Sequence, residues 1–436
     1  MRQEETGISE RGEPDPGQAA PPVRALFMTS IPSPYQVDLF TLLAKQPGVD
    51  IHVFFCGDTR SDRSFDVPEQ YPFPATVLPS HVVKGMPHDW HKVQGLKQQL
   101  LRTLPIDIAV LGGYAIPAIR QLHSLLRQEG IPWYLWGEGH EKKQRSALLS
   151  HVKTWYLQRF LRSCAGIWGI GRLACRDYAK LVPLGTEVLN IPYSPNLSHL
   201  LHPSKSVSKQ AESLRGDWDI PDPIVLLFSG RLSPRKAPDL LVDAFLALAP
   251  RFPRLRLQFA GDGPLESGLR AKISAAGLMQ RVRWLGFVQQ ESLSAAYLSS
   301  NLFVLPTRGH EGWGVVVQEA MAARLPVLVS DRVGAGADLI RNSRVGAIFA
   351  ANDLPALTTT IERFVSQPEQ LSDMGKDARE TVAMFDCSVN AELIADVLRR
   401  HSPKLNSKSH SPSAGASRDV NTKTNQNQQA MRKNTP

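Results

Sequence analysis

The chain has 436 residues, more than one ordinary hydrophobic core accommodates, so two domains are expected. Hydrophobic residues make up 42% and charged residues 21%, which is typical of a globular protein and excludes a disordered or fibrous one. The formal net charge of +9 predicts a basic face for an anionic ligand or a membrane surface, and it does not require a nucleic acid partner.

The chain has 4 cysteines, and none of them forms a CxxC pair or a closely spaced framework. This pattern predicts a reduced, cytoplasmic protein. The first residues are polar and acidic and lack the apolar segment of a secretory signal. The longest apolar run lies within IDIAVLGGYAIPAI and is shorter than the roughly 18 residues that a spanning helix needs.

In the first half, short apolar runs alternate with helical patterns. Strands are predicted at 23–30, 50–57, 106–113, 131–137 and 164–171, and helices at 35–46, 116–130 and 146–163. Runs of this kind, apolar on both faces, are typical of strands in a parallel sheet that is covered by helices on both sides. The first half is therefore predicted to be a parallel α/β domain.

A polar segment at 202–223 interrupts the alternation, and a second alternating series follows it. We predict two Rossmann-like α/β domains that face each other across a cleft. The expected division is a disordered tail at 1–22, a first domain at 23–201, a linker at 202–223, a second domain at 224–384, a helix at 385–401 that packs back on the first domain, and a disordered basic tail at 402–436.

The stretch FSGRLSPRKAPDLL places two cations after a predicted strand and before a predicted helix. Gly230 allows a tight turn at the strand end, and Arg231 and Lys236 follow it. Ligands of such sheets bind beyond the carboxyl ends of the strands, where cations and free helix amides suit a diphosphate. The alternative is a solvated loop with incidental charges.

Two further strand ends carry weaker signals. Gly261 and Gly263 flank an aspartate in a turn, for which a structural role is favoured. Phe287 and Val288 follow the predicted strand VRWLG, where a loop offers backbone groups and an apolar face to a nucleobase.

The stretch HEGWGVVVQEAMAARLPVLVS contains Glu311 and Glu319, with seven residues between them. A helix turns by about 100° per residue, and Glu311 precedes the helix, so the spacing does not make an opposed acid–base pair. Two carboxylates suit hydroxyl groups at two places on one extended ligand. The glycines at 312 and 314 allow close approach to the backbone, and the helix start favours an anion. The alternatives are two solvated glutamates, or a metal site, which the lack of a suitably spaced histidine disfavours.

Together, GRLSPRK, GDGP and EGWGVVVQEAMAARLPVLVSDRVGAGADLI, in this order, resemble the retaining glycosyltransferases of glycosyltransferase family 4, which have the GT-B fold. The resemblance covers about 224–350. In the first half, IPSPYQVDLF and GIGRLACRDYAKLVPLGTEVLNIPY are similar, less specifically, to the branch that builds bacterial surface sugars.

The resemblance implies a role for each candidate residue. Arg231 and Lys236 would bind the donor diphosphate, Glu311 the hydroxyls of the donor sugar, and Glu319 the ribose. The backbone of Gly312, Trp313 and Gly314 would approach the sugar and phosphate, and the base would be read near Phe287 and Val288, largely by backbone groups. Residues 23–201 would form the acceptor-binding domain, and 224–384 the nucleotide-sugar-binding domain. The resemblance also implies a nucleotide-sugar donor, a glycan or lipid-linked acceptor, and no metal or other cofactor.

Three departures from the family pattern bear on these roles. Ala237 stands where the family usually has glycine, and SIPSPY follows the first strand in place of a glycine pair. Many members have a histidine after a middle strand of the N-terminal domain, where this chain has Glu138 and His140. Glu138 lies nearer the strand end, and we favour it as the carboxylate on the acceptor side. The alternative is a loop glutamate beside lysines.

The stretch EKKQRSALLSHVKTWYLQRFLRS is basic and contains aromatic residues. Such a helix suits the surface of an anionic membrane, and its apolar positions also suit core packing. With a lipid-linked acceptor, a peripheral location on the inner face of the plasma membrane follows.

Three other functions remain as alternatives. One is a GT-B relative with another activity, such as a sugar-nucleotide epimerase or a phosphorylase. A nicotinamide oxidoreductase would need a GxGxxG loop after the first strand, which TSIPSPYQ does not supply. A non-catalytic binding protein is the third.

Overall fold

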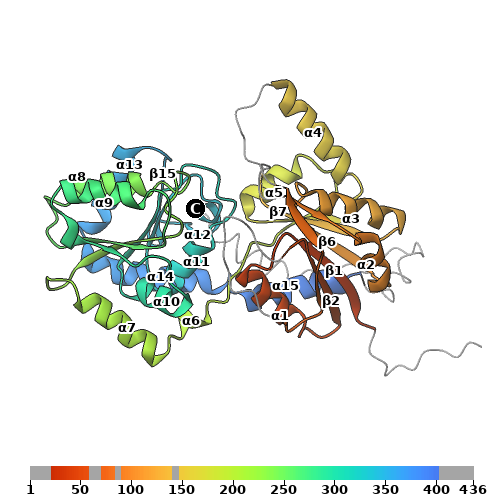
Figure 1. The fold of residues 1–436 in the computed structure, drawn as a ribbon, viewed down its shortest axis with the longest axis horizontal. Helices are drawn as coiled ribbons and strands as arrows, with labels where there is room; N and C mark the ends of the chain where they lie inside the picture. The colour runs from red at the N-terminus through yellow and green to blue at the C-terminus, as the bar shows by residue number, and fades with distance from the viewer. Residues whose placement is uncertain (1–20, 58–69, 84–89, 140–146, 402–436) are drawn as a thin grey trace, which may run out of the picture.

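The computed structural model describes residues 21–57, 70–83, 90–139 and 147–401. Residues 1–20 and 402–436, for which the sequence predicts disorder, lie outside these ranges, as does His140. Figure 1 shows two lobes side by side, each built around a sheet with helices on both faces. No helix of the described ranges is long and apolar enough to cross a membrane.

The N-terminal domain is built on a seven-stranded parallel sheet in the order β3-β2-β1-β6-β7-β8-β9. Its strands are β1 (Val23–Thr29), β2 (Val49–Phe55), β3 (Ala75–Val77), β6 (Ile108–Gly112), β7 (Trp133–Gly137), β8 (Gly166–Gly169) and β9 (Glu187–Asn190). Its helices are α1 (Pro34–Leu43), α2 (Leu96–Thr103), α3 (Pro117–Gln128), α4 (Ala147–Leu161) and α5 (Arg172–Ala179). Five parts of this domain lie outside the predicted elements, namely α2, α5, β3, β9 and the antiparallel pair β4 (Ser80–Val83) and β5 (Trp90–Val93).

The C-terminal domain has a six-stranded parallel sheet in the order β12-β11-β10-β13-β14-β15. Its strands are β10 (Ile224–Ser229), β11 (Leu255–Ala260), β12 (Val282–Trp284), β13 (Leu302–Leu305), β14 (Val327–Ser330) and β15 (Gly346–Phe349). Its helices are α8 (Pro238–Leu248), α9 (Glu266–Ala275), α10 (Gln290–Leu298), α11 (Val315–Ala322), α12 (Gly334–Leu339), α13 (Leu354–Val365) and α14 (Leu371–Ala383), with short 3-10 helices at Met279–Arg281 and Pro368–Gln370.

Both sheets follow from the same sequence pattern. Every residue of β10, β11, β13 and β14 is buried, which explains why these strands are continuous apolar runs rather than alternating ones. In each sheet the strand order reverses beside the first strand of the domain, between β1 and β6 and between β10 and β13. Crevices at such reversals, beyond the carboxyl ends of the strands, are where open α/β sheets bind ligands.

The segment predicted to be a linker, 202–223, contains helix α7 (Lys205–Gly216), after the short α6 (Ser198–Leu201). The Ser204 hydroxyl accepts a hydrogen bond from the Val207 amide and caps α7. Val207 and Ala211 pack against Ala295 of α10. The linker prediction is corrected accordingly, because an apolar stripe with helical spacing lies hidden among the polar residues and attaches this segment to the C-terminal domain.

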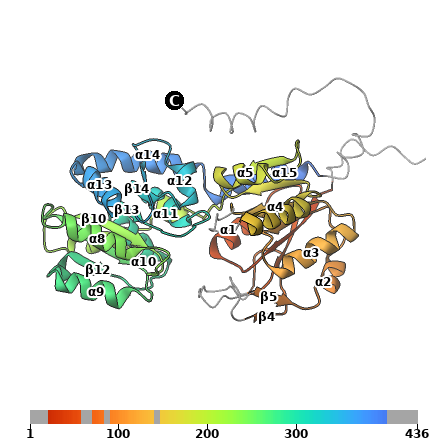
Figure 2. The same ribbon diagram turned by 90° about the horizontal axis from the view of Figure 1, so that it is seen from above.

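The last described helix, α15 (Cys387–Arg399), returns to the N-terminal domain and lies against α1, β1 and β2. Figure 1 shows it in blue next to the red helix α1 of that lobe. Arg399 Nε donates a 2.9 Å hydrogen bond to the Pro47 carbonyl. Figure 2, seen from above, shows α14 in the C-terminal lobe and α15 in the N-terminal lobe.

Candidate active site

The predicted site residues of the C-terminal domain all lie at the carboxyl ends of its strands or on the helices that follow. Gly230 and Arg231 follow β10, Lys236 directly precedes α8, and Phe287 and Val288 follow β12. Glu311 to Gly314 connect β13 to α11, which carries Glu319. Since β10 and β13 are neighbours at the strand-order reversal, the loops with Lys236 and Glu311 meet there.

The loops after β10 and β11 hold each other through backbone groups. The Gly230 amide donates to the Ala260 carbonyl at 2.9 Å, and the Leu232 amide donates to the Asp262 carbonyl at 2.7 Å. A Cβ on Gly261 would lie 2.2 Å from the Gly230 oxygen, and one on Gly263 would lie 2.5 Å from the Leu232 oxygen. These glycines are therefore required for loop packing, which agrees with the structural role that the sequence favoured.

Glu311 is the anionic centre of the site. Its Oε2 lies 2.7 Å from Lys236 Nζ and 2.5 Å from Arg235 Nη1. Burial alone would raise the pKa of Glu311, but the two cations outweigh burial and hold this pKa below its usual value. The carboxylate is therefore ionised at neutral pH, with two cations beside it.

Arg235 is a site residue that the sequence analysis did not single out. It lies in the same SPRK stretch as Lys236, and sequence alone gave no reason to prefer it over Arg231. In the structure Arg231 is exposed, whereas the Arg235 guanidinium reaches both the Glu311 carboxylate and the His310 carbonyl. The position of Lys236 agrees with its predicted place at the loop, and its side chain is only 11% exposed.

Glu319 lies one helix turn inside α11 and faces Tyr297 of α10. The Tyr297 hydroxyl donates a 2.8 Å hydrogen bond to Glu319 Oε2. Burial raises the pKa of Glu319, and the bond from Tyr297 lowers it by a smaller amount. Tyr297 was also missed from sequence, because nothing in LSAAYLSS separates it from an ordinary core tyrosine.

The aromatic residues of the predicted site divide into an exposed and a buried one. Phe287 is 61% exposed beside the strand end, where an apolar face is available to a ligand. Trp313 is 1% exposed, and its indole nitrogen donates a 2.8 Å hydrogen bond to Gln318 Oε1. The Trp313 side chain packs near Phe385 and beside Gly171 of the N-terminal domain, so the backbone of Trp313, and not its ring, is the part expected to approach a ligand.

Gly312 and Gly314 shape the loop between Glu311 and α11. Gly314 has a φ of 96°, a left-handed conformation that favours glycine and begins α11. A Cβ on Gly312 would lie 2.0 Å from the Glu138 carboxyl carbon. The space that the sequence analysis assigned to a ligand at Gly312 is therefore filled by Glu138 of the N-terminal domain.

Glu138 reaches this loop from the end of β7. The Tyr178 hydroxyl of α5 donates a 2.9 Å hydrogen bond to the Glu138 carbonyl and fixes the backbone there. The Glu138 side chain itself is exposed on its own domain's side and lies against the C-terminal domain at Gly312. This contact places the Glu138 carboxylate against Gly312, the residue that directly follows Glu311.

A cavity of about 290 Å³ lies between the two domains beside these residues. On the N-terminal side it is lined by Gly139, Leu173, Ala174, Arg176 and Asp177, and on the C-terminal side by Arg308, Gly309, His310, Gly312, Asp331, Arg332 and Gly334. The lining combines charged groups of both signs with backbone of the Glu311 loop. A polar ligand can therefore contact both domains at once.

Comparison with known proteins shows which family and which structures this chain is similar to. Residues 210–381 match the family model described as glycosyl transferases group 1. The structure of the Anabaena protein Alr3699/HepE in complex with UDP superposes with a TM-score of 0.67 at 17% identity, covering 86% of this chain and 99% of that one. The protein has the GT-B fold, and its residues 210–381 are similar to the glycosyl transferases group 1 family.

Other proteins are similar to this chain in fold or over part of its sequence. Sucrose-phosphate synthase from Thermosynechococcus elongatus has a TM-score of 0.64 at 19% identity, covering 89% of this chain and 100% of that one. The D-inositol 3-phosphate glycosyltransferase 2 of Catenulispora acidiphila is 35% identical over 41% of this chain and 44% of its own length. The phosphatidyl-myo-inositol mannosyltransferase of Mycobacterium leprae is 31% identical over 52% and 58%, respectively. The chain thus spans about half the length of these curated relatives.

Proposed function

We propose that this GT-B protein is a glycosyltransferase that moves a sugar from a nucleotide-sugar donor to a glycan or lipid-linked acceptor, with retention of configuration. The observation that carries the proposal is the cluster of Lys236, Arg235 and Glu311 at the strand-order reversal, followed by the start of α11. This cluster offers a diphosphate two cations and helix amides, and it offers a sugar hydroxyl a carboxylate.

In this proposal, negative charge builds on the leaving diphosphate as the bond to the sugar breaks. Fixed cations and amide dipoles at that place stabilise the transition state without a metal ion. Lys236 and Arg235, which pair with Glu311 in the structure, exchange part of that pairing for the donor phosphates. The acceptor attacks from the face that the nucleotide leaves, and the leaving phosphate takes the acceptor's proton.

Glu319 and the loop at Phe287 complete the proposed donor site. The Glu319 carboxylate binds the ribose hydroxyls, held in place by Tyr297. The exposed Phe287 and its neighbour Val288 border the nucleobase. Glu138 lies on the acceptor side, close to the sugar, because its carboxyl group contacts Gly312. The space between the domains then receives donor sugar and acceptor together.

The proposed setting is the synthesis of bacterial surface polysaccharide, on the cytoplasmic side of the plasma membrane. One relative is named lipopolysaccharide core biosynthesis mannosyltransferase LpcC, from Rhizobium leguminosarum, and is 34% identical over 38% of this chain. A structural neighbour is described as WaaG, a glycosyltransferase involved in lipopolysaccharide biosynthesis. These names support a surface glycan as the acceptor class.

Helix α4 supports a peripheral contact with the membrane. Core packing explains Leu157, Phe160 and Leu161, which are buried, but it does not explain the face formed by the earlier part of the helix. That face exposes large apolar side chains, with Trp155 at 64%. The exposed residues are Leu149, Val152, Trp155 and Tyr156. Figure 1 shows α4 projecting from the N-terminal lobe. With Arg159 and Arg162 nearby, this face suits an anionic bilayer.

A donor screen tests the proposed activity. Purified protein is mixed with UDP-, GDP- and dTDP-sugars, and both the thermal shift and the slow release of free nucleotide are measured. We expect one nucleotide class to raise the melting temperature and to be hydrolysed slowly to the diphosphate. Binding of none of them would contradict the proposal, and release of an epimerised sugar nucleotide would favour the epimerase alternative.

A liposome assay tests the membrane contact. We expect the protein to co-sediment with vesicles containing an anionic phospholipid, and the triple change Leu149→Ser, Val152→Ser and Trp155→Ser to reduce the bound fraction about tenfold or more, since each exposed side chain contributes buried apolar area. The matched control is Met279→Ser and Met384→Ser, exposed apolar side chains of the other domain. Equal sedimentation of the two variants would contradict the role of α4.

A further inference from the structure

Helix α12, a six-residue helix of the C-terminal domain, contacts the donor loop at one end and the N-terminal domain at the other. At its first turn, the Gly334 amide donates to the Glu311 carbonyl and the Ala335 amide donates to the Trp313 carbonyl, both at 2.9 Å. A Cβ on Gly334 would lie 2.1 Å from the Gly312 oxygen, so this packing is close. The start of α12 therefore holds the backbone of the proposed donor loop from behind.

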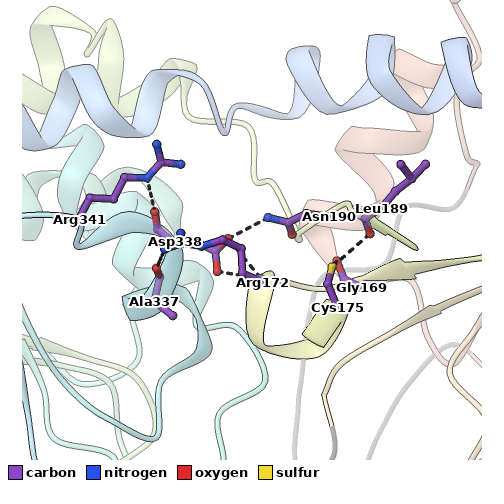
Figure 3. Close-up of polar contacts among 8 residues, drawn as sticks. All are labelled: Gly169, Arg172, Cys175, Leu189, Asn190, Ala337, Asp338 and Arg341. Carbon is purple, nitrogen blue, oxygen red and sulfur yellow. Dashed lines mark hydrogen bonds and ion pairs between the residues drawn. The ribbon is translucent and has the colours of Figure 1, made fainter. Parts of the chain in front are cut away.

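At its other end, α12 presents Asp338, whose side chain is 1% exposed. Asp338 Oδ2 accepts a 3.0 Å hydrogen bond from the Arg172 amide, and Oδ1 accepts a 2.8 Å hydrogen bond from Asn190 Nδ2 (Figure 3). Arg172 also donates to the Ala337 carbonyl through its guanidinium group. A carboxylate of one domain thus caps the first residue of α5, a helix of the other.

The N-terminal side of this contact is anchored in its own sheet. Cys175 of α5 lies with its Sγ 3.4 Å from the Leu189 carbonyl of β9, the strand that also ends at Asn190. Figure 3 shows α5 and the end of β9 on one side and α12 on the other, with Asp338 between them. Arg172 and Asn190 are therefore fixed to the N-terminal sheet and move together with the N-terminal domain.

Removal of the carboxylate would leave two partly buried donors, the Arg172 amide and Asn190 Nδ2, without this acceptor. Hydrogen bonds to a charged acceptor contribute more than neutral ones, and the amides at a helix start favour an anion. Burial raises the pKa of Asp338, and the bonds from the Arg172 amide and Asn190, followed by the charge of Arg172, act in the opposite direction. Arg341 approaches the same residue, with Nε 3.0 Å from the Asp338 carbonyl.

We propose that Asp338 is a positioning residue and that α12 is a mechanical link which sets the orientation of the two domains and the shape of the Glu311–Gly314 loop together. The bonds at the two ends of so short a helix cannot change independently, because a shift of α5 moves α12, and α12 carries the amides that hold the donor loop. Domain movement and donor binding are then coupled through this helix. This inference rests on the proposed function only for the statement that the Glu311–Gly314 loop binds the sugar-nucleotide donor.

Amide hydrogen exchange tests this link in the full chain. In Asp338→Ala we expect the Arg172 amide to exchange about tenfold faster, the scale of one lost hydrogen bond to a charged group. The Gly334 and Ala335 amides, which do not touch the Asp338 side chain, are also expected to exchange several-fold faster. Asp338→Asn retains one acceptor oxygen and should give a smaller increase at all three amides.

The matched control is Asp353→Ala, which removes a capping carboxylate that bonds to the Ala356 amide inside the C-terminal domain. It should leave exchange at Arg172, Gly334 and Ala335 unchanged. Faster exchange at Arg172 alone in Asp338→Ala, or no change at any of the three, would overturn the link.

If Asp338→Ala does not fold, Asn190→Ala carries the same test from the other domain. UDP-glucose affinity, measured on the same variants, supplies a second readout and is expected to fall with the faster exchange. Failure of the wild-type protein to bind any sugar nucleotide would reject the proposed function, whereas the exchange result would still decide the mechanical link.

Discussion

The two domains have the same kind of sheet but differ in how their strand-end loops are held. In the C-terminal domain, the loops after β10, β11, β13 and β14 are joined by backbone hydrogen bonds. They also pack closely at glycines where a side chain would clash with a neighbouring loop. In the N-terminal domain, the carboxylate that we place at the site, Glu138, follows β7 and rests on the other domain. This difference suggests that the C-terminal domain is preformed for the donor, whereas the N-terminal domain contributes to the site only when the domains meet.

The largest effect is expected from Lys236→Ala, which removes a fixed cation from the donor side. Turnover should fall by about 100-fold or more, the scale for loss of one electrostatic contact in a transition state. Initial rates with the donor found by screening measure it, and Lys272→Ala, on the exposed surface of α9, is the control. Near-normal turnover in Lys236→Ala would break the assignment of the diphosphate to this loop.

The same variant changes the response to pH. In the wild type, the pKa of Glu311 is lower in the folded than in the unfolded protein. Its ion pairs therefore stabilise the fold at pH values above the ordinary glutamate pKa of about 4.3. This stabilisation is lost as the pH falls through the folded-state pKa. Without Lys236 the pKa of Glu311 should rise, and this loss should begin at a higher pH. Thermal unfolding across a pH series measures the change.

Glu138→Gln tests the other side of the comparison. If the N-terminal domain acts only on the assembled site, turnover should fall about 10- to 100-fold, as for loss of a charged group that acts in the transition state, while donor affinity changes little. Donor titration and single-turnover rates separate the two quantities. Glu129→Gln, an exposed change at the end of α3, is the control. A loss of donor affinity equal to the loss of turnover would show that both domains build the donor site.

Glu319→Gln is expected to weaken donor binding and to stabilise the protein at neutral pH. The folded pKa of Glu319 is raised by burial, so its contribution to stability is fullest below about pH 4.3 and is lost as the pH rises through the folded value. The glutamine amide carries no charge, so this loss of stability disappears. It binds hydroxyl groups less strongly than a carboxylate does, and the affinity for the donor should fall about tenfold. Calorimetry and donor titration at pH 7 check both; an unchanged affinity would contradict the ribose role.

The smallest effect is expected from Ala237→Gly. Ala237 begins α8 with a φ of 55°, a left-handed conformation that costs a non-glycine residue about 1–2 kcal/mol. Loss of one buried methyl offsets about 0.8 kcal/mol of the gain, so the free energy of unfolding should rise by about 1 kcal/mol or less. The control Ala249→Gly, at the right-handed end of the same helix, should destabilise. Chemical denaturation measures both, and destabilisation of Ala237→Gly beyond about 1 kcal/mol would contradict the strain.

The sequence predicted the parts of the molecule that depend on neighbours in the chain. The parallel sheets, the loop positions of Lys236 and Glu311, and the tight turns at Gly230 and Gly261 follow from apolar runs and glycine spacing. The GT-B fold followed from the order of these stretches and is confirmed by the structural neighbours.

The contributions of Arg235, Tyr297 and Asp338 could not be predicted, because each depends on a partner that is remote in the sequence. Arg235 meets Glu311 and Tyr297 meets Glu319 only after the sheet forms. The buried position of the Trp313 ring could not be predicted for the same reason, since a tryptophan between glycines suits both an exposed face and a buried contact, and only the packed domains decide between them.

Helix α15 has a consequence for the order in which the protein is completed. Its buried Ile394, Val397 and Leu398 belong to the same apolar cluster as Leu39 and Phe40 of α1. A ribosome releases the N-terminal sheet first, yet that sheet's outer helix stays uncovered until nearly the whole chain has been synthesised. The N-terminal domain is thus begun first and finished last, and its apolar α1 face remains exposed to solvent during that interval.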